Sequence, residues 1–248
     1  MFGRTRYHAA VALAAAGVIG MAAAGVSYAG HRGPDKLPMI AISLSPKMPE
    51  GAVPLITGAP GEMAAKWVTR GTQDAPTWPV SADGVASTGG KDITTREEFG
   101  DCFIHIEFRC VPGEDGKMHN SGNSGIGLQG RYEIQMFDSY GKDPGVGGVG
   151  ALYSQTAPLS NPSKPAGQWQ TYDIVFRAPR SDNAGVVVEQ PRATVFLNGV
   201  IVQNNEAFKG PTGIQYGDFK GQPARGPMVL QGNHDPQQFR NFWVAPIN

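Results

Sequence analysis

Two stretches of the sequence set polar side chains at alternate positions, in a pattern that could bind a ligand. The stretch DCFIHIEFRC contains Glu107 and Arg109. The stretch RYEIQMFDS contains Glu133 and Gln135. Carboxylate and amide groups held on a rigid element form hydrogen bonds with hydroxyl groups. The pattern therefore predicts a surface suited to a polyhydroxylated ligand such as a sugar.

A two-residue period in both stretches explains how these side chains could share a surface. Successive residues of a β-strand point to opposite faces, and the apolar residues of each stretch occupy one set of alternate positions. Glu107 and Arg109 then project together beside His105, and Glu133 projects beside Gln135. The alternative for each pair is that it lies on an ordinary solvated face of the sheet. For Glu107 and Arg109 this would mean a plain surface ion pair, which adds little stability. We expect His105 itself at the surface.

Aromatic residues near these strands support the prediction of a sugar site. Rings bind the apolar C–H faces of a sugar, whereas amides and carboxylates bind its hydroxyl groups. Tyr140 and Trp169 could provide such rings. Asn123 lies in the glycine-rich GNSG segment, where the backbone can approach a ligand or simply form a turn.

Further short alternating segments predict a domain built almost wholly from strands. Turn-forming glycine and proline are abundant, with 34 and 20 residues, and Asn198 and Gly199 suit the tight turn of a β-hairpin. Short strands joined by turns are typical of a β-sandwich. We expect an all-β, jelly-roll sandwich of two antiparallel sheets. The expected strands lie within residues 101–110, 124–129, 131–139, 168–179, 193–203, 227–231 and 239–247.

The beginning of the chain has the pattern of an export signal. Arg4 and Arg6 precede an apolar run rich in alanine and glycine, and the run ends in Ser-Tyr-Ala, a small-x-small cleavage pattern. We expect residues 1–29 to be removed and the protein to be periplasmic or extracellular, without a stable membrane anchor. A retained anchor is the alternative, because the run is about as long as a marginal membrane span.

The rest of the chain divides into an arm and a domain. Residues 30–60 are rich in proline and glycine and are expected to form a linker or extended arm, with one short strand near 38–44. Residues 61–248 are expected to form the sandwich. The charges balance, with 21 basic and 21 acidic residues. A nucleic-acid partner is not expected, because such binding needs a basic patch.

The two cysteines are expected to be buried free thiols. Cys102 and Cys110 lie on one expected strand, which would place them about 26 Å apart at roughly 3.3 Å per residue. A disulfide needs Cα atoms within about 7 Å. Both side chains therefore suit the core as small apolar groups.

Five segments in order resemble the 3-keto-disaccharide hydrolase domain family. They are ITTREEFGDCFIHIEFRCVP, GNSGIGLQGRYEIQMFDSYG, GALYSQTAPLSNPSKPAGQWQTYDIVFRAPR, ATVFLNGVIVQ and LQGNHDPQQFRNFWV. The similarity runs from about Trp67 to Ile247. It implies the twisted sandwich of concanavalin-type lectins and laminarinases, with a concave sheet that faces a sugar.

The resemblance also implies activity on glycosides whose glucose unit is already a ketone at C3. A ketone acidifies the hydrogen on C2, so a general base can remove it and the enolate can expel the C1 substituent. Addition of water completes a net hydrolysis. Such a site needs a base, positive charge at the enolate oxygen and an acid for the leaving group. It does not need the paired carboxylates of ordinary glycosidases.

Residues in the family-like motifs are candidates for these roles. Glu133 is expected as the base or a metal ligand, and His234 suits proton transfer or metal ligation because histidine titrates near neutrality. Glu107 and Arg109 complete the expected catalytic set, and a divalent metal is a further candidate for the positive charge. The expected substrate-binding residues are Asn123, Gln129, Gln135, Tyr140, Trp169 and Gln231. The catalytic candidates, with Gln135 and Gln231, are expected to converge on one concave pocket.

One motif departs from the family pattern. Relatives often have Gly-Asp-His-Gly where this chain has Gly-Asn-His-Asp, so a carboxylate is lost at Asn233 and gained at Asp235. The difference bears on catalysis and on the orientation of His234 more than on the fold. A non-catalytic carbohydrate-binding module is therefore the alternative function, because a fold does not determine an activity. An envelope protein held by an uncleaved leader is a third hypothesis.

Overall fold

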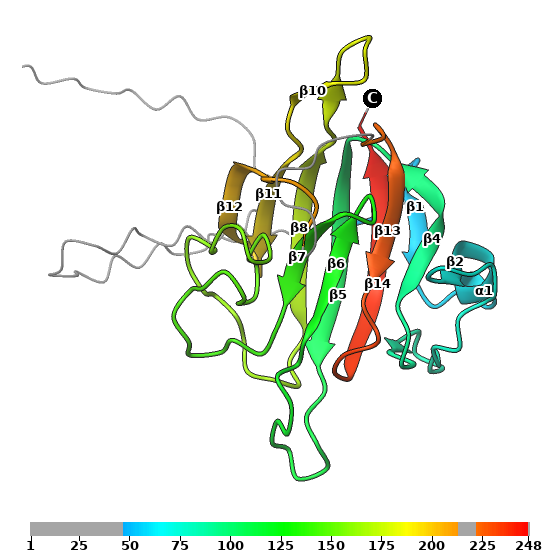
Figure 1. Ribbon diagram of the computed structural model, residues 1–248. Coiled ribbons are helices and arrows are strands. Elements are labelled where there is room, and N and C mark those ends of the chain that lie inside the picture. The colour runs from blue at the N-terminus through cyan, green and yellow to red at the C-terminus, as the bar shows by residue number, and fades with distance from the viewer. Residues whose placement is uncertain (1–46, 213–221, 248) are drawn as a thin grey trace, which may run out of the picture. The chain divides into compact units, whose positions relative to one another are not determined.

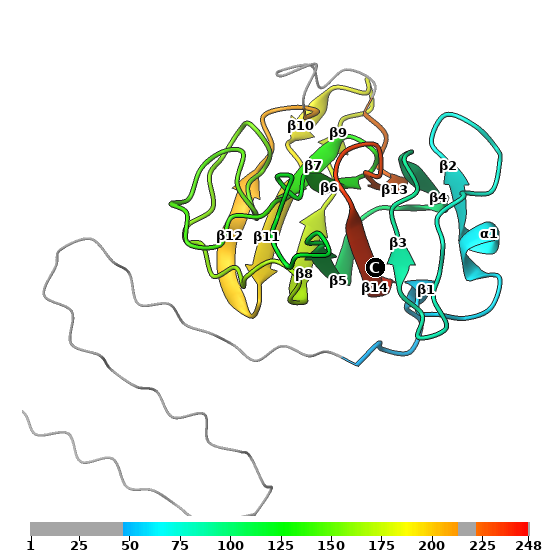
Figure 2. The same cartoon turned by 90° about the horizontal axis from the view of Figure 1, so that it is seen from below.

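The alternating segments form two stacked antiparallel sheets, which confirms the all-β, concanavalin-like sandwich (Figures 1 and 2). The structure is a computed structural model and describes residues 47–212 and 222–247. Within that part of the chain one short helix, α1 (Glu62–Lys66), accompanies the strands.

The larger sheet, here called sheet A, contains the first and last strands of the described chain. Its strand order is β1–β14–β5–β8–β11–β12, and β3 also pairs with β14. The strands of sheet A are β1 (Val53–Ile56), β3 (Ala86–Ser87), β5 (Cys102–Cys110), β8 (Gln170–Arg177), β11 (Arg192–Leu197), β12 (Val200–Ala207) and β14 (Gln237–Pro246).

The second sheet, sheet B, has the order β2–β4–β13–β6–β7. A separate two-stranded ribbon pairs β9 with β10. The strands of sheet B and of this ribbon are β2 (Trp67–Thr69), β4 (Ile93–Phe99), β6 (Ser124–Leu128), β7 (Tyr132–Met136), β13 (Gly226–Leu230), β9 (Arg180–Ser181) and β10 (Val187–Glu189).

The core lies between the sheets and contains the apolar set that the two-residue period predicts. The alternate residues of β5 from Cys102 to Cys110 are at most 5% exposed, and those of β7 from Tyr132 to Met136 are fully buried. The Tyr132 ring of sheet B packs at 6.0 Å from Phe176 of sheet A. Burial of each large apolar side chain contributes roughly 1.5–3 kcal/mol, so these layers stabilise the sandwich.

Two further sequence features have the expected local structure. Asn198 and Gly199 join β11 to β12 with φ values of 52° and 79°, the left-handed conformation that a type I′ turn requires. Cys102 and Cys110 are free and buried at opposite ends of β5. Burial raises the pKa of the Cys102 thiol to about 12 and that of Cys110 to about 11, so neither suits a nucleophile.

Part of the expected N-terminal organisation lies outside the described residues. This applies to the export signal at 1–29 and to the short strand near 38–44. The last part of the expected arm is described, and there β1 pairs with β14, so this part belongs to sheet A. The described residues contain no helix long and apolar enough to cross a membrane.

Candidate functional site

A row of polar positions crosses the outward face of sheet B from β2 to β7. Arg70 N donates to Asp92 O at 2.9 Å, and Gln231 N donates to Gly125 O at 3.1 Å. Gly125 pairs in register with Gln135. The pairing of β13 with β4 brings Gln231 beside Asp92, because Leu230 is the register partner of Ile93. We call these five residues, Arg70, Asp92, Gln231, Gly125 and Gln135, the polar row.

Glu133 leans from β7 across the glycine of the polar row. Its register partner is Gly127, yet a Cβ atom added to Gly125 would lie only 2.6 Å from Glu133 Oε1. The carboxylate therefore lies over Gly125, where the side chain of Gln231 forms a hydrogen bond with it. Gly125 and Gly127, both on β6, have no side chains. The Glu133 carboxylate is therefore the group that projects from this part of the outward face.

Burial raises the pKa of Glu133 from 4.5 to about 7. The hydrogen bond from Gln231 opposes this rise, as does the positive charge of Arg70, whereas the negative charge of Asp92 adds to it. A general base works best when its pKa lies near the operating pH. Perturbed carboxylates of this kind are concentrated at functional sites.

Gln135 and Asn123 continue the polar row beyond Glu133, but Gln135 is only 2% exposed, so the expectation that it binds the substrate directly is wrong. Gln135 Nε2 lies 3.3 Å from Asn123 Oδ1. Turning the Gln135 amide by 180° places its nitrogen 3.1 Å from Glu133 Oε1 and 2.6 Å from the Ser124 carbonyl oxygen. On the core side, the Tyr172 hydroxyl donates to the Gln135 carbonyl at 2.5 Å. Sheet A therefore supports the backbone of the site.

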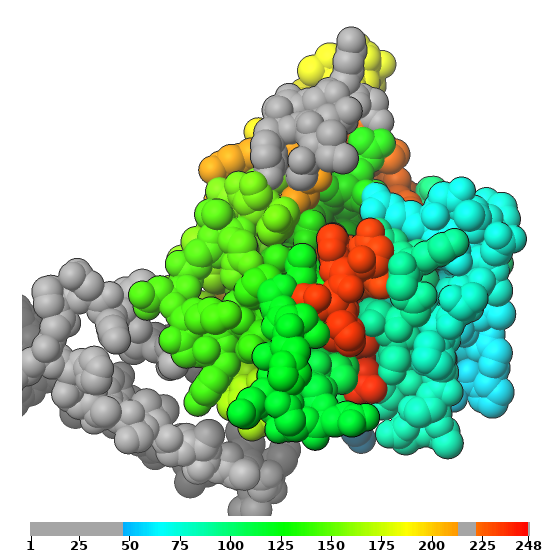
Figure 3. Space-filling view, turned by 60° about the horizontal axis from the view of Figure 1, so that its bottom comes forward, coloured from blue at the N-terminus to red at the C-terminus, as the bar shows by residue number. Residues whose placement is uncertain are grey.

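Asp235 holds the GNSG bend beside the polar row. Its Oδ2 accepts hydrogen bonds from Ser121 Oγ at 2.7 Å, Ser121 N at 3.1 Å and Asn123 N at 2.8 Å. Burial opposes ionisation of Asp235, but these hydrogen bonds together outweigh it and lower the pKa. His234 is exposed in the same loop. Figure 3 shows this loop, in red, between the green segment after β5 and the blue-green segment near β4.

The family of the chain follows from its sequence. Residues 51–245 match the family described as 3-keto-alpha-glucoside-1,2-lyase-like domain. The chain belongs to this family. The match confirms the resemblance found in the five sequence motifs.

Solved structures support the fold of this lyase-like domain. One, described as a "putative glycosyl hydrolase" from Parabacteroides distasonis ATCC 8503, is 34% identical, with a TM-score of 0.70 over 80% of this chain and 84% of that chain. A second structure of the same description and organism is 17% identical, with a TM-score of 0.56 over 80% of this chain and 95% of that chain, and shares the fold. No curated protein matches the chain.

Three expected site residues of the lyase-like domain form a separate cluster on the outward face of sheet A. Glu107 Oε2 accepts a hydrogen bond from Arg240 Nε at 2.7 Å, and Arg109 Nε donates to Gln238 Oε1 at 2.6 Å. The guanidinium carbons of Arg109 and Arg240 lie 4.7 and 4.1 Å from the centre of the Trp169 ring. The expected convergence on one pocket is wrong, because Glu107 and Glu133 face outward from opposite sheets.

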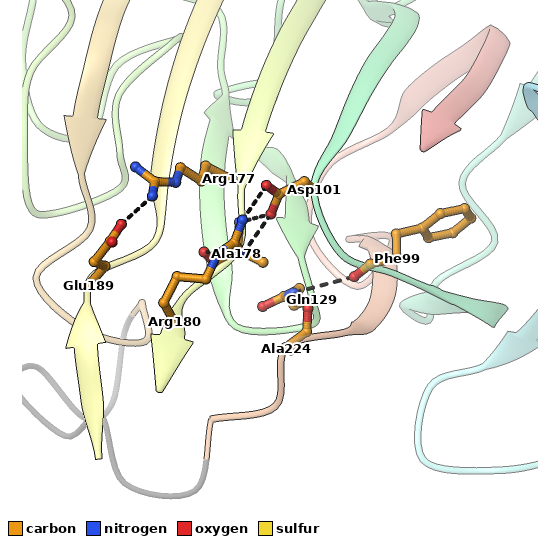
Figure 4. A network of polar contacts seen from close by, with 8 residues as sticks. All are labelled: Phe99, Asp101, Gln129, Arg177, Ala178, Arg180, Glu189 and Ala224. Atoms are coloured by element: carbon orange, nitrogen blue, oxygen red, sulfur yellow. Dashed lines mark hydrogen bonds and ion pairs between the residues drawn. The ribbon is translucent and has the colours of Figure 1, made fainter. Parts of the chain in front are cut away.

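Two expected binding residues of the lyase-like domain also lie apart from the polar row. Gln129 is 3% exposed, and its Nε2 donates to Phe99 O at 3.3 Å and to Ala224 O at 3.0 Å (Figure 4). It supports the turn between β6 and β7 and is not open to a ligand. Tyr140 is 57% exposed in the segment that follows β7.

His105 is buried, so the expectation of a surface histidine is wrong. It points outward from β5, but its Nδ1 lies 2.7 Å from Asp173 Oδ1 and its ring stacks on Trp243 at 5.3 Å. A bulge in β14 gives Asn241 a φ of 46° and places its Nδ2 3.1 Å from His105 Nε2. Strand periodicity predicts the face of a side chain but not what packs over that face.

Arg70 and Asp92 were not among the candidates from the sequence. They follow the three-residue strand β2 and precede β4, outside the alternating stretches that drew attention to Glu133. A single sequence signal could have found them. Both are charged residues at the boundary of a segment with β-strand character, and such boundaries often form the rim of a site.

The described part of the lyase-like domain offers two hollows but no cluster of metal ligands. Within 47–212 and 222–247, no group of three or more histidine, cysteine or acidic residues is placed to hold a metal ion. The divalent metal, a candidate from the sequence, therefore has no ligand set among the described residues. One hollow of about 350 Å³ lies near α1 and another of about 680 Å³ near β10, and Glu133 lines neither.

Proposed function

We propose that the chain is a carbohydrate-active enzyme that cleaves glycosides already oxidised at C3 of a glucose unit. The observation that carries this proposal is the Glu133 carboxylate, desolvated over Gly125 with the Gln231 amide beside it. Membership of the 3-keto-alpha-glucoside-1,2-lyase-like family supports the substrate class. The similarity to a "putative glycosyl hydrolase" supports the broader activity.

Glu133 acts as the general base in the proposed reaction. Its carboxylate takes the proton from C2, and the electron pair of that C–H bond forms the enolate of the C3 ketone. The ketone is restored as the C1–O bond breaks, which leaves a double bond between C1 and C2. Water then adds its oxygen to C1 and a proton to C2, so the sum is hydrolysis.

Neighbouring side chains have supporting roles in this scheme. The Gln231 amide lies beside the carboxylate and can bind a sugar hydroxyl group, as can the half-buried Asn123, which the buried Gln135 amide contacts. His234 is exposed in the loop that begins with Gln231, so its imidazole can deliver a proton to the leaving oxygen.

A non-catalytic sugar-binding module is the competing function on the same fold. Such a module needs amides and rings, but it has no use for a carboxylate whose pKa burial raises to about 7. Glu133 therefore favours an enzyme. We further propose export, on the signal pattern of residues 1–29. Mass spectrometry of the native protein tests this, because a chain that begins at Gly30 has lost its leader.

The test of the function is incubation of the purified chain with a 3-keto-glucoside in D₂O. We expect release of the C1 substituent and incorporation of deuterium at C2, because the reaction breaks and remakes that bond. The unoxidised glucoside is the matched control, and it should not react because its C2 hydrogen is not acidic. Absence of both cleavage and exchange, with and without added divalent cations, would refute the enzyme and leave the binding module.

Substitution of Gly125 by alanine should lower turnover without unfolding the domain. The new Cβ would lie 2.6 Å from Glu133 Oε1, so the carboxylate must move away from Gln231. A displacement of about 1 Å can cost on the order of 10²-fold in rate. Steady-state kinetics and thermal melting would measure both effects. Gly145→Ala is the control, because a Cβ there meets nothing within 4 Å; equal turnover in both variants would contradict the placement of Glu133.

A further inference from the structure

The elimination needs positive charge at the C3 oxygen, and the sequence candidate for this role is misplaced. Arg109 lies on the outward face of sheet A, over Trp169, whereas Glu133 lies on sheet B. The base and the cation must reach adjacent atoms of one sugar ring, because the oxygen that becomes negative is bonded to C3, the neighbour of C2. A cation that stabilises this oxygen therefore has to lie on the outward face of sheet B.

Arg70 reaches across that face from the opposite edge of the sheet. Its Nη1 lies 3.3 Å from Asp92 Oδ2, at the start of β4, and its Nη2 donates to the carbonyl oxygen of Gly130 at 3.4 Å. Gly130 lies in the turn between β6 and β7. In the strand order of sheet B, β4 and β13 separate β2 from β6. The arginine side chain therefore extends over β4 toward the turn that holds Gly130.

The guanidinium lies beside the two glycines of β6, Gly125 and Gly127, over which the Glu133 carboxylate projects. A Cβ on Gly127 would be 3.9 Å from Gly130 Cα, and a Cβ on Gly130 would be 3.8 Å from a methyl group of Val229. Gly127 is in turn the register partner of Glu133. The carbonyl oxygen that binds Arg70 thus belongs to a turn folded over Gly127 and Val229, one strand from the carboxylate.

Arg70 is held in place and still has free donors. The Asp92 carboxylate that binds it is itself fixed, because Gly232 N donates to Asp92 Oδ1 at 3.0 Å. A guanidinium carries five N–H donors, and within residues 47–212 and 222–247 Arg70 uses two of them. Its side chain is 50% exposed. A preorganised donor with unused hydrogens is suited to a charge that develops during a reaction.

We infer that Arg70 binds the C3 oxygen of the substrate and stabilises the enolate while Glu133 takes the C2 proton. The inference rests on the proposed function and adds a catalytic residue to it. Binding of the enolate leaves the guanidinium protonated throughout, so the only proton that moves in this step passes from C2 to Glu133. Arg70 also supplies the positive charge that opposes the rise of the Glu133 pKa, which is consistent with their proximity.

The test compares Arg70→Ala and Arg70→Gln with Arg96→Ala, an exposed arginine on β4. Removal of one oxyanion donor typically lowers kcat by about 10² to 10³-fold, and we expect this loss in both Arg70 variants and none in Arg96→Ala. The acid limb of the kcat/KM profile should move to higher pH, because the charge that favours ionised Glu133 is gone. Added guanidinium ion should restore part of the activity of Arg70→Ala.

The outcomes separate this inference from the proposed function. If the unaltered chain does not convert a 3-keto-glucoside, the proposed function fails and the role of Arg70 with it. If the chain is active, the inference alone fails when Arg70→Gln keeps turnover within twofold and an unshifted pH profile. Arg70→Gln decides the matter even where Arg70→Ala does not fold, because glutamine keeps part of the aliphatic stem and an N–H donor at this half-exposed position while it removes the charge.

Discussion

Replacement of Glu133 by glutamine should lower kcat by about 10² to 10⁴-fold, the usual contribution of a general base. The amide keeps the shape of the side chain and its contact with Gln231, but it cannot accept the C2 proton. In the unaltered enzyme, kcat/KM should rise about tenfold per pH unit and level off near pH 7, where the carboxyl group ionises. Sugar binding should largely survive the substitution, and isothermal titration calorimetry would measure it. Turnover equal to that of the unaltered chain would remove Glu133 from the mechanism.

The same substitution should stabilise the fold at high pH. The pKa of Glu133 is raised from 4.5 to about 7, so ionisation is harder in the folded state than in the unfolded state. The free energy of unfolding of the unaltered chain therefore falls relative to Glu133→Gln between pH 4.5 and 7, by at most about 3 kcal/mol. Urea denaturation at pH 4.5, 6 and 8 would measure the difference. A difference that stays constant over this range would show that the carboxylate is not desolvated.

Replacement of Asp173 by alanine should destabilise the fold by about 3–5 kcal/mol and leave kcat unchanged. Asp173 is fully buried, and its Oδ1 lies 2.7 Å from Nδ1 of the buried His105. Removal of one partner leaves the other buried without its hydrogen bond, which is the costly way to break a buried pair. Urea denaturation would measure the loss, and kinetics below the melting temperature would measure turnover.

A double variant provides the control for this prediction. His105→Leu combined with Asp173→Val removes both polar groups, and replacement of a buried pair by apolar residues is often neutral or stabilising. The double variant should therefore be more stable than Asp173→Ala alone. If it is equally unstable, the loss comes from packing and not from the orphaned histidine. If either variant loses turnover while folded, the outward face of sheet A contributes to catalysis.

The sequence predicted the faces of strands better than their places in the sheets. The alternation in β5 and β7 correctly separated the core from the outward positions, because a period of two is a local property of the chain. The same alternation could not show that Glu107 and Glu133 lie on opposite sheets. That outcome depends on pairings between distant segments, such as β13 with β4 and β6, which no local pattern encodes.

The candidate site divides in the same way. Glu133 and Gln135 share a strand, and Gln231 follows a strand that pairs with β6, so motifs close to these positions were enough to suggest them. Arg70 reaches the Gly130 turn beside Glu133 only through the length of its side chain and the register of β2, β4 and β13. The burial of His105 depends on a bulge in β14 and on Trp243, and a bulge breaks the very period from which exposure was inferred.

The positions of β13 and β14 also limit how early in its synthesis this domain can fold. β13 lies between β4 and β6, and β14 lies between β1 and β5, so the last two strands to be synthesised complete the middle of both sheets. A nascent chain that stops before Gly226 has two divided sheets with unpaired strand edges, which favour aggregation. It also lacks Gln231, the centre of the polar row. Folding and chemistry must both wait until β13 and β14 have been synthesised.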